Sequence, residues 1–415
     1  MCSIFGWMGK ISGLDRSHII NSANERGRDG FGFWLDGDEY RSMGSVEDFA
    51  FLRKAIPNAK RVLGNFRATP TTETISTTEL LQPYDGIVHN GTIANDKDFG
   101  DFPIDSMVLP IILKERAFGT NLLEALSKIK GSFALAYFDQ NTLILAANYK
   151  PIHFMYRDDG FMFASTPDML PGYSTPMKPY SIMSVDEWFN VKALDFVLKQ
   201  NNKVVISASS GLDSTTVAFM LNAQGYDVTL AHFKYGCLAE DKELDRIEKI
   251  ADYGNFELVV IDMPSKVMRG SIVEGTYHDN AIEGVEYAMD WVSARNLLML
   301  AMLTSYAESF DYGFLAFGGN LEEAAAYPDN EQEFGRRFNA LLPFATQNGV
   351  KITLLQPLST YMKHEIVTIG VGLGVPYDLT WSCYSSAERH CGRCGPCYMR
   401  KVAFERNGLK DPVFS

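Results

Sequence analysis

K-V-V-I-S-A-S-S-G-L-D-S-T-T, residues 203–216, joins a short apolar run to the start of a helical pattern. The apolar run is typical of a buried strand, and the helical composition after it continues to about Gly225. Small residues between the two let backbone N–H groups converge at a helix N-terminus, which carries partial positive charge. The stretch therefore predicts an anion cradle at the end of a parallel strand, with a simple Gly/Ser helix cap as the alternative.

The same alternation continues along the chain. The segment 227–233 (D-V-T-L-A-H-F) reads as a strand, 242–251 (K-E-L-D-R-I-E-K-I-A) as a helix and 256–262 (F-E-L-V-V-I-D) as a further strand. Strands separated by single helices imply right-handed crossovers and a parallel sheet. The C-terminal half is therefore predicted to be a doubly wound α/β domain.

The first 170 residues have a different pattern. Short β-like runs with turn signals dominate, for example I-V-H-N-G-T-I (87–93) and S-F-A-L-A-Y-F-D (132–139). Residues 171–184 contain three prolines and show no periodicity, which is typical of a connecting segment. We therefore predict two α/β domains, at residues 2–175 and 191–415, joined by a linker at 176–190.

Composition limits the class of protein. The chain has 415 residues, of which 46% are hydrophobic and 21% charged, and its formal net charge is −13. No apolar run approaches the ~18 residues of a membrane helix, and the N-terminus does not resemble a secretory signal, so a cytoplasmic protein is expected. The acidic balance disfavours a large nucleic-acid surface, and basic residues near the C-terminus such as Arg400 are interpreted as a solvated face. The sequence leaves homodimer formation and contact with nucleic acid open.

Four cysteines lie within fifteen residues near the C-terminus, in a C-x7-C-x2-C-x2-C spacing. They are Cys383, Cys391, Cys394 and Cys397. Two-residue gaps allow neighbouring thiolates to face one ion, and four thiolates leave no coordination position open for a substrate. The spacing predicts a structural zinc site at residues 383–397, with free or disulfide-paired cysteines as the alternative.

The other chemically informative cysteine is Cys2, which becomes N-terminal when the initiator Met is removed. A free α-amino group has a pKa of about 7.7–8.0 and can act as the base for a neighbouring thiol. Four segments follow Cys2 in order: R-G-R-D-G-F-G (26–32), G-N-F-R-A-T (64–69), H-N-G-T-I-A-N (89–95) and I-D-S-M-V-L (104–109). Taken singly, each also has a structural interpretation, such as a hairpin turn at Asn90-Gly91 or a helix cap at Asp105.

Together with Cys2, these segments resemble the class II glutamine amidotransferases over residues 2–170. The resemblance implies an N-terminal-nucleophile hydrolase fold, which is an αββα sandwich of antiparallel sheets. It also implies that Cys2 attacks the glutamine amide and that Asn90 and Gly91 form the oxyanion hole. Arg67 would bind the glutamine carboxylate and Asp105 its ammonium group. The chain departs from the family pattern at Asn65, where His is usual, and at Arg28, where Pro is usual.

The Ser/Gly stretch resembles the S-G-G-x-D-S loop of ATP pyrophosphatases, with Ser210 in place of the second Gly. The resemblance implies an adenine nucleotide α-hydrolase-like fold that binds ATP with magnesium. The residues assigned to the phosphates and magnesium are Ser209, Ser210, Gly211, Asp213 and Ser214.

Later segments resemble the QueC family of 7-cyano-7-deazaguanine synthases over residues 200–412. They include V-S-A-R-N (292–296), F-G-G-N-L-E-E (317–323), M-K-H-E-I (362–366) and the cysteine cluster. Arg295, Asn296 and Lys363 are candidates for contacts with phosphate or acceptor. Cys237-Leu238-Ala239 stands where the family usually has Gln, a basic residue and His, so the identity of the acceptor is less certain than the activation chemistry.

The resemblance implies that ATP adenylates a carboxylate on a 7-deazaguanine, that ammonia from glutamine gives the amide, and that a second adenylation gives the nitrile. A sheltered path for ammonia is expected, because ammonium has no lone pair for attack. Three alternatives stay open. They are archaeosine-type conversion of the nitrile to a formamidine, asparagine-synthetase-like chemistry, and a non-catalytic scaffold that contains the zinc site.

Overall fold

The computed structural model describes residues 2–44, 55–69, 74–114, 116–264, 268–277 and 290–414. The chain divides into two compact units, Met1–Val197 and Leu198–Ser415. Strands β11 (Ser181–Val185) and β12 (Val191–Asp195) belong to the first unit, so the linker predicted at 176–190 lies too early. The apolar side chains of β11 are buried in a sheet, and this burial outweighs the effect of the prolines that precede them.

The first unit contains two antiparallel sheets. The larger has the order β10 (Thr175–Pro176), β8 (His153–Arg157), β9 (Gly160–Ala164), β1 (Ser3–Gly9), β4 (Arg61–Arg67), β2 (Gly30–Leu35) and β3 (Asp38–Met43). The smaller has the order β12, β11, β7 (Thr142–Ala147), β6 (Gly131–Asp139) and β5 (Val88–Ile93). Its helices are α1 (Gly13–Arg26), α3 (Leu109–Ile112) and α4 (Thr120–Ser127), with short 3-10 turns η2 (Ile56–Asn58), η3 (Thr78–Leu80), η4 (Asp96–Asp98), η5 (Asp105–Val108) and η6 (Pro167–Met169).

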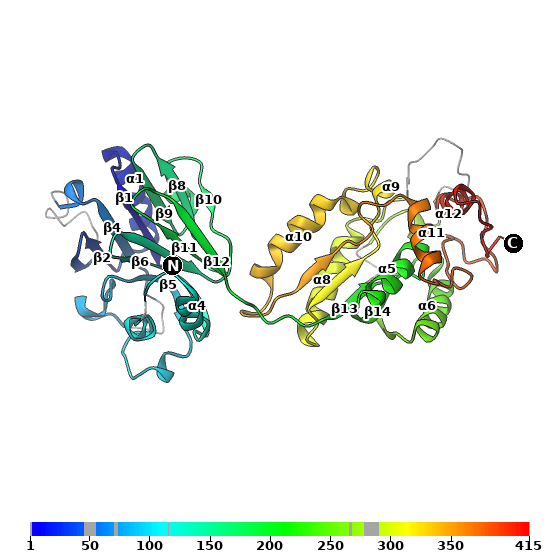
Figure 1. Ribbon diagram of the computed structural model, residues 1–415, viewed down its shortest axis with the longest axis horizontal. Coiled ribbons are helices and arrows are strands. Elements are labelled where there is room, and N and C mark those ends of the chain that lie inside the picture. The colour runs from blue at the N-terminus through cyan, green and yellow to red at the C-terminus, as the bar shows by residue number, and fades with distance from the viewer. Residues whose placement is uncertain are drawn as a thin grey trace. The chain divides into compact units, whose positions relative to one another are not determined.

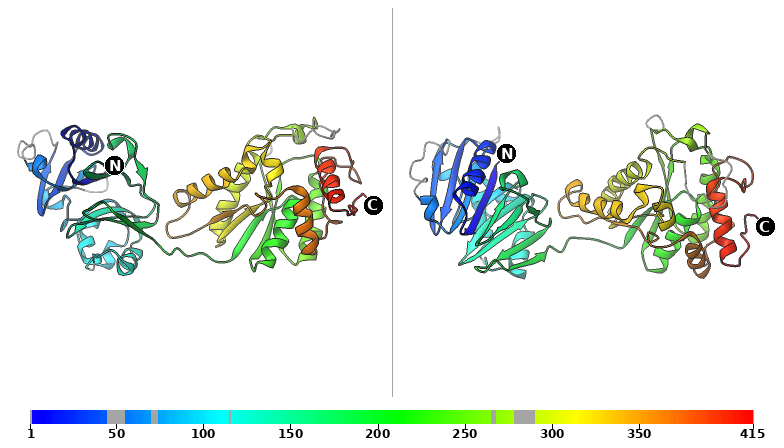
Figure 2. Two further views of the ribbon diagram at one scale, coloured as in Figure 1. Left: turned by 45° about the horizontal axis from the view of Figure 1, so that its top comes forward. Right: turned by 90° about the horizontal axis from the view of Figure 1, so that it is seen from above.

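Side chains point to alternate faces along each strand, so each sheet packs against helices with one face and against the other sheet with its second face. On β1, Phe5 and Trp7 pack in the cluster that includes residues of α1, whereas Ile4 packs in the cluster between the two sheets. On β6, Ala134 faces the other sheet and Leu135 faces the cluster that includes α3 and α4. The first unit is therefore an αββα sandwich, as predicted, and its stacked sheets are visible in Figure 2.

The second unit is built on one parallel sheet. Its order is β15 (Glu257–Asp262), β14 (Asp227–Lys234), β13 (Lys203–Ser207), β16 (Phe314–Phe317) and β17 (Thr353–Leu355). Its helices are α5 (Leu212–Ala223), α6 (Glu240–Gly254), α7 (Ser271–Glu274), α8 (Arg295–Ser309), α9 (Leu321–Ala324), α10 (Gln332–Ala345), α11 (Lys363–Gly372) and α12 (Gly395–Arg406), with the 3-10 turn η8 (Pro328–Asn330). The predicted doubly wound parallel sheet is confirmed (Figure 1).

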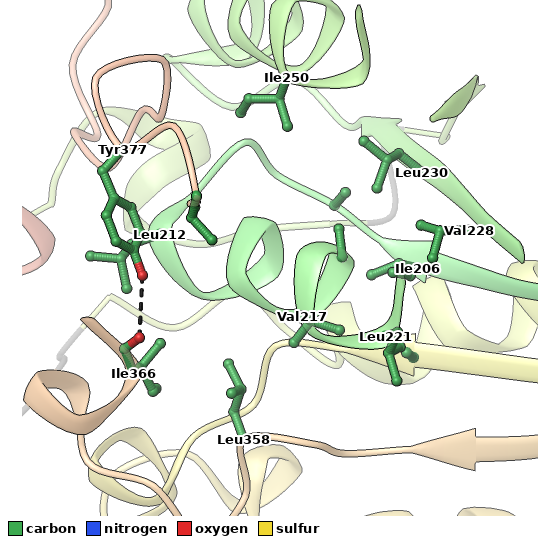
Figure 3. Close-up of a cluster of buried hydrophobic side chains, with 14 of the residues drawn as sticks. Ile206, Leu212, Val217, Leu221, Val228, Leu230, Ile250, Leu358, Ile366 and Tyr377 are labelled. Atoms are coloured by element: carbon green, nitrogen blue, oxygen red, sulfur yellow. Dashed lines mark hydrogen bonds between the residues drawn. The ribbon is translucent and has the colours of Figure 1, made fainter. Parts of the chain in front are cut away.

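Helices cover both faces of this sheet. One cluster of buried side chains joins the strands to α5, α6, α11 and α12, and a second joins them to α8 and α10. Figure 3 shows the first cluster, in which Val217 of α5 and Ile366 of α11 belong to one apolar core. Tyr377 packs at its edge and donates a hydrogen bond to the Ile366 carbonyl at 3.2 Å. In the described part of the chain, every helix is too short or too polar to cross a lipid bilayer.

Arg400 on α12 differs from the solvated face that its sequence suggests, because its side chain is completely buried. Its Nε and Nη2 donate to the two carboxylate oxygens of Asp411 at 2.7 and 3.0 Å, and Nη2 also donates to the Tyr377 carbonyl at 2.7 Å. The bidentate pair with Asp411 holds the C-terminal segment to α12, and the bond to Tyr377 holds α12 to the segment that precedes the cysteine cluster.

Arg400→Ala should destabilise the chain by about 3–5 kcal/mol, because the Asp411 carboxylate would stay buried without its partner. Urea unfolding of the full chain measures this change. Arg406→Ala, at an exposed position on the same helix, is the control and should change stability by less than about 0.5 kcal/mol. Equal stability of the two variants would contradict the role of the buried pair.

Candidate active site

A cavity of about 440 Å³ opens in the second unit, among the loops that follow β13, β14 and β16. Ligands of open parallel sheets bind at this carboxyl edge. Seven residues that the sequence assigns to ATP or the acceptor line the cavity: Ser209, Gly211, Asp213, Ser214, Arg295, Asn296 and Lys363. The structure thus brings Lys363 to Asp213, from which it is separated by 150 positions in sequence.

The loop after β13 leads directly into α5, whose N-terminus faces the cavity. The Ser209 N–H donates to Ser214 Oγ at 3.3 Å, and this bond closes the loop. Gly318, at the end of β16, lies against it, because a Cβ there would stand 3.0 Å from the Ser214 nitrogen. The close approach explains the need for glycine at that position, and the converging N–H groups make an anion cradle.

Ser210 is the exception among the predicted phosphate residues. Its backbone is left-handed (φ 60°), its side chain is fully buried, and it does not line the cavity. Within the described ranges the Ser210 hydroxyl has no hydrogen-bond partner, whereas the Ser210 carbonyl accepts from the Trp381 N–H at 3.0 Å. Any contact of Ser210 with a phosphate would therefore come from its backbone, not from its hydroxyl.

Lys363, the first residue of α11, connects three helices at the cavity. Its Nζ donates to Asp213 Oδ2 of α5 at 2.6 Å and to Glu323 Oε1 of α9 at 2.7 Å. Burial by itself lowers the pKa of the lysine, but the two carboxylates outweigh burial and raise that pKa, so the ammonium stays charged. Two carboxylates beside one ammonium leave an excess of negative charge.

A buried acceptor in this cluster is not satisfied. Among the described residues, Asp213 Oδ1 has no hydrogen-bond partner, although Asp213 Oδ2 is paired with Lys363. An orphaned carboxylate oxygen next to an anion cradle fits magnesium, which proteins bind through one or two carboxylates together with substrate phosphates. The residues present at the site are therefore compatible with a magnesium–ATP complex.

The cavity lining also includes Tyr235, Cys237, Glu243 and Arg295. Arg295 Nη1 donates to Tyr235 Oη at 3.2 Å, and its guanidinium lies 5.8 Å from the centre of the Tyr235 ring. Burial raises the pKa of the Glu243 carboxyl to about 7, and burial together with Glu243 raises the pKa of the Cys237 thiol to about 12. Cys237 is thus a buried, protonated thiol that also faces the cavity.

Sequence reasoning assigned no role to His232 or Glu243. His232 is 1% exposed, and its Nδ1 lies 3.1 Å from the Ala208 carbonyl, so Nδ1 carries the proton. Its Nε2 is then an acceptor, and it is buried in the cavity wall with no partner in the part of the chain that the structure describes. The signal in the sequence was the position of both residues. His232 lies at the carboxyl end of a predicted parallel strand, and Glu243 lies at the start of the predicted helix that follows that strand.

In the first unit, Cys2 precedes β1 and lies beside the end of β4. Its Sγ donates to the Ala68 carbonyl at 3.5 Å, next to Arg67, which is the last residue of β4 and is buried. Asn90 and Gly91 lie on β5 in the other sheet, and Asn90 Nδ2 donates to Ser165 Oγ at 3.4 Å. A Cβ on Gly91 would stand 2.0 Å from the Ser132 carbonyl oxygen, so only glycine fits there.

Hydrogen bonds link these predicted residues across the two sheets. Asn65 is 1% exposed, and its Nδ2 donates to the carbonyls of Ser3 and His89 at 3.2 and 3.3 Å. The His89 ring meets Ser106 Oγ at 2.8 Å, and that hydroxyl donates to Asp105 Oδ1 at 3.0 Å. Burial holds the pKa of His89 well below its usual value, so His89 is neutral. Asn65, a departure from the family pattern, therefore joins the residue after the proposed nucleophile to the residue before Asn90.

The four clustered cysteines come together as the spacing predicts. Their sulfur atoms all lie within 4.8 Å of one another, near the ~3.8 Å edge of a tetrahedron with zinc–sulfur bonds of about 2.3 Å. Backbone N–H groups donate to Cys383 Sγ and Cys391 Sγ at 3.3–3.4 Å, an arrangement that stabilises thiolates. Gly392 makes the turn between two of them with φ 72°. These four sulfur atoms can hold a metal ion.

Comparison with known proteins agrees with this site. A family model described as queuosine biosynthesis protein QueC matches residues 203–408. A 7-cyano-7-deazaguanine synthase of Sulfolobus acidocaldarius is 40% identical over 95% of this chain and 94% of its own length. A protein of the same name from Methanothrix thermoacetophila is 37% identical over 51% of this chain and 97% of its own length.

Among solved structures, glutamine phosphoribosylpyrophosphate amidotransferase from B. subtilis is 14% identical, covers 96% of both chains and has a TM-score of 0.39. The two-unit fold and the cavity define an α/β enzyme, and its relatives are 7-cyano-7-deazaguanine synthases. The chain belongs to the 7-cyano-7-deazaguanine synthase family.

Ser210→Gly should stabilise the chain by up to about 1 kcal/mol, because a left-handed serine costs more than the added freedom of glycine in the unfolded state. Thermal unfolding measures the change. Ser210→Ala is the matched control, since it removes the hydroxyl but keeps the unfavourable backbone conformation. A Gly variant no more stable than the Ala variant would contradict this interpretation.

Cys394→Ser should reduce bound zinc from about one ion per chain to a small fraction, because a closed site needs all four thiolates. Elemental analysis of the purified protein gives the metal content. Cys237→Ser, which changes a cysteine outside the cluster, should keep its zinc. Full zinc content in the Cys394 variant would show that the cluster is not the metal site.

Proposed function

We propose that this enzyme makes 7-cyano-7-deazaguanine from 7-carboxy-7-deazaguanine, using ATP and ammonia that it releases from glutamine. The observation that carries the proposal is the cavity in which the Ser/Gly loop, Lys363 and Arg295 meet, in a chain of the 7-cyano-7-deazaguanine synthase family. A carboxylate does not react with ammonia, because oxide is a poor leaving group. Adenylation replaces it with AMP, which leaves readily.

The ATP step uses the loop between β13 and α5. Backbone N–H groups there and the α5 N-terminus would hold the phosphates while the acceptor carboxylate attacks the α-phosphorus and pyrophosphate leaves. Lys363 would exchange part of its contact with Asp213 and Glu323 for a phosphate oxygen. Asp213 would hold magnesium through Oδ1, and the ion would supply positive charge to the phosphates.

Two rounds of activation complete the conversion. Ammonia attacks the acyl carbon of the adenylate, AMP leaves, and the amide forms with loss of a proton. A second ATP then adenylates the amide oxygen, with release of pyrophosphate and of one proton from the amide nitrogen. Loss of AMP and a proton from that intermediate leaves the nitrile. Each nitrile therefore consumes two ATP and one ammonia.

The first unit would supply the ammonia. Its hydrogen-bond network from Ser3 through Asn65, His89 and Ser106 to Asp105 would align Cys2 with the oxyanion hole and the glutamine ammonium site. The Cys2 thiolate would attack the glutamine amide carbon, with Asn90 Nδ2 and the Gly91 N–H stabilising the oxyanion. Ammonia leaves, and water then hydrolyses the thioester to glutamate.

Cys2→Ala should lower glutamine-dependent nitrile formation by more than about a thousandfold, because the nucleophile is lost. With ammonium chloride as nitrogen source, the same variant should match the wild type within about twofold. Liquid chromatography with mass detection of the nitrile measures both rates.

Loss of both activities in a folded Cys2→Ala protein would contradict the division of roles, and equal activity with glutamine would contradict a Cys2 glutaminase. Formation of a formamidine from the nitrile would instead favour the archaeosine-type reaction. Turnover of aspartate in place of the deazaguanine would favour asparagine-synthetase-like chemistry.

A further inference from the structure

Five carboxylates line the cavity in the described part of the second unit, and four of them already have polar partners. Asp213 and Glu323 share the Lys363 ammonium. Asp290 accepts from Ser271 Oγ at 2.8 Å, and Asp329 accepts from the side chain of Asn296. Glu243 is different, because among the described residues its carboxylate accepts a hydrogen bond only from the Cys237 thiol, at 4.0 Å, with Arg295 as a nearby positive charge.

The position of Glu243 makes its weak pairing informative. It lies in the first turn of α6, directly after the loop that leaves β14, and lines the cavity with Tyr235 and Arg295. Its side chain is half-buried, and a thiol is a weak donor compared with an N–H group. The Glu243 oxygens can therefore accept hydrogen bonds from a ligand that brings N–H donors into the cavity.

We propose that Glu243 binds the acceptor base by accepting two hydrogen bonds, from the ring N1–H and the exocyclic 2-amino group of a guanine-type ring. This inference rests on the proposed function and adds to it the residue that selects the base. Glu243 would be a specificity residue, because the reacting carboxylate lies on the opposite, five-membered ring.

The hydrogen-bonding edges of the two bases, the guanine-type acceptor and the adenine of ATP, support the assignment. A guanine-type edge presents two adjacent donors, which match the two oxygens of an ionised carboxylate, as in bidentate pairs. The edge of adenine presents one donor and one acceptor, and its N1 lone pair would face a carboxylate oxygen. Glu243 would thus keep the adenine of ATP out of the acceptor position.

The surroundings of Glu243 also suit a flat, polar ring. Tyr235 is buried beneath the Arg295 guanidinium, and Trp291 stacks against Tyr327 at 5.9 Å in the same cavity wall. Aromatic faces and arginine planes are the usual partners of bases removed from water. Arg295 can donate to the ring carbonyl O6, the acceptor that adjoins N1–H.

The test compares two substitutions of Glu243 with the wild type on the proposed substrate and on one analogue. The full-length enzyme, Glu243→Gln and Glu243→Asp are assayed with 7-carboxy-7-deazaguanine and with 7-carboxy-7-deazahypoxanthine, which lacks the 2-amino group. The readout is kcat/KM for the base, from AMP release with ammonium chloride as nitrogen source, together with KM for ATP. Asp241→Asn, which removes an exposed carboxylate from the same helical turn, is the matched control.

The wild type should prefer the 2-amino base by at least about thirtyfold, because the analogue leaves one oxygen of Glu243 without a donor when the base fills the cavity. Glu243→Gln should lose at least about thirtyfold in kcat/KM for the 2-amino base, and its preference should fall to less than about threefold. The KM for ATP should change less than about twofold, and Asp241→Asn should behave as the wild type. Glu243→Asp keeps the carboxylate and should retain part of the preference.

Two results would overturn this inference alone. They are a wild type that accepts both bases equally, and a Glu243→Gln variant that keeps the wild-type preference. If the wild type releases AMP with neither base, the proposed function itself fails. The ratio of the wild-type kcat/KM values for the two bases tests the inference even if the Gln variant does not fold.

Discussion

The second unit depends on one buried cation. Lys363 Nζ is 2.6–2.7 Å from carboxylate oxygens of Asp213 and Glu323, so a single ammonium ties α11 to α5 and α9 around the cavity. Without that ammonium, the two carboxylates would repel each other in a site that is largely removed from water. With it, the loop after β13 stays open for an anion, and one oxygen of Asp213 remains available for a metal ion. The ion pairs of Lys363 with Asp213 and Glu323 thus shape the cavity, and bound substrates would rearrange these same ion pairs.

The rest of the site follows from the direction of the strands. In a parallel sheet every strand ends at the same edge, so the loops after β13, β14 and β16 meet although they are far apart in sequence. For this reason the alternation of strands and helices, together with the Ser/Gly loop and the resemblance to QueC, was enough to predict the fold of this half and seven of the residues that line its cavity. The clustering of the four cysteine sulfur atoms was predictable for a similar reason, because the short gaps between the cysteines constrain the local geometry.

Other features were not readable from the sequence, and each has a physical cause. The linker was placed too early, because prolines mark turns equally well inside a domain and between domains, and only the burial of β11 distinguishes the two. Arg400 looked like a surface charge until the chain brought Asp411 to it. Glu243 and His232 gave no motif, because only the folded chain brings them to the cavity, and only there is His232 Nε2 buried without a partner among the described residues. Ser210 matched its motif by position, but the backbone turns its hydroxyl away from the cavity.

The central claim is that nitrogen passes from the glutamine amide into the nitrile of a deazaguanine in this one chain. The most direct measurement is mass spectrometry of the product formed by the full-length enzyme from amide-nitrogen-15 glutamine, magnesium, ATP and 7-carboxy-7-deazaguanine, with excess unlabelled ammonium in a parallel reaction. The account predicts a nitrile that carries one labelled nitrogen, with two AMP released for each nitrile. A nitrile without label, or no deazaguanine product while glutamate is still formed, would contradict it.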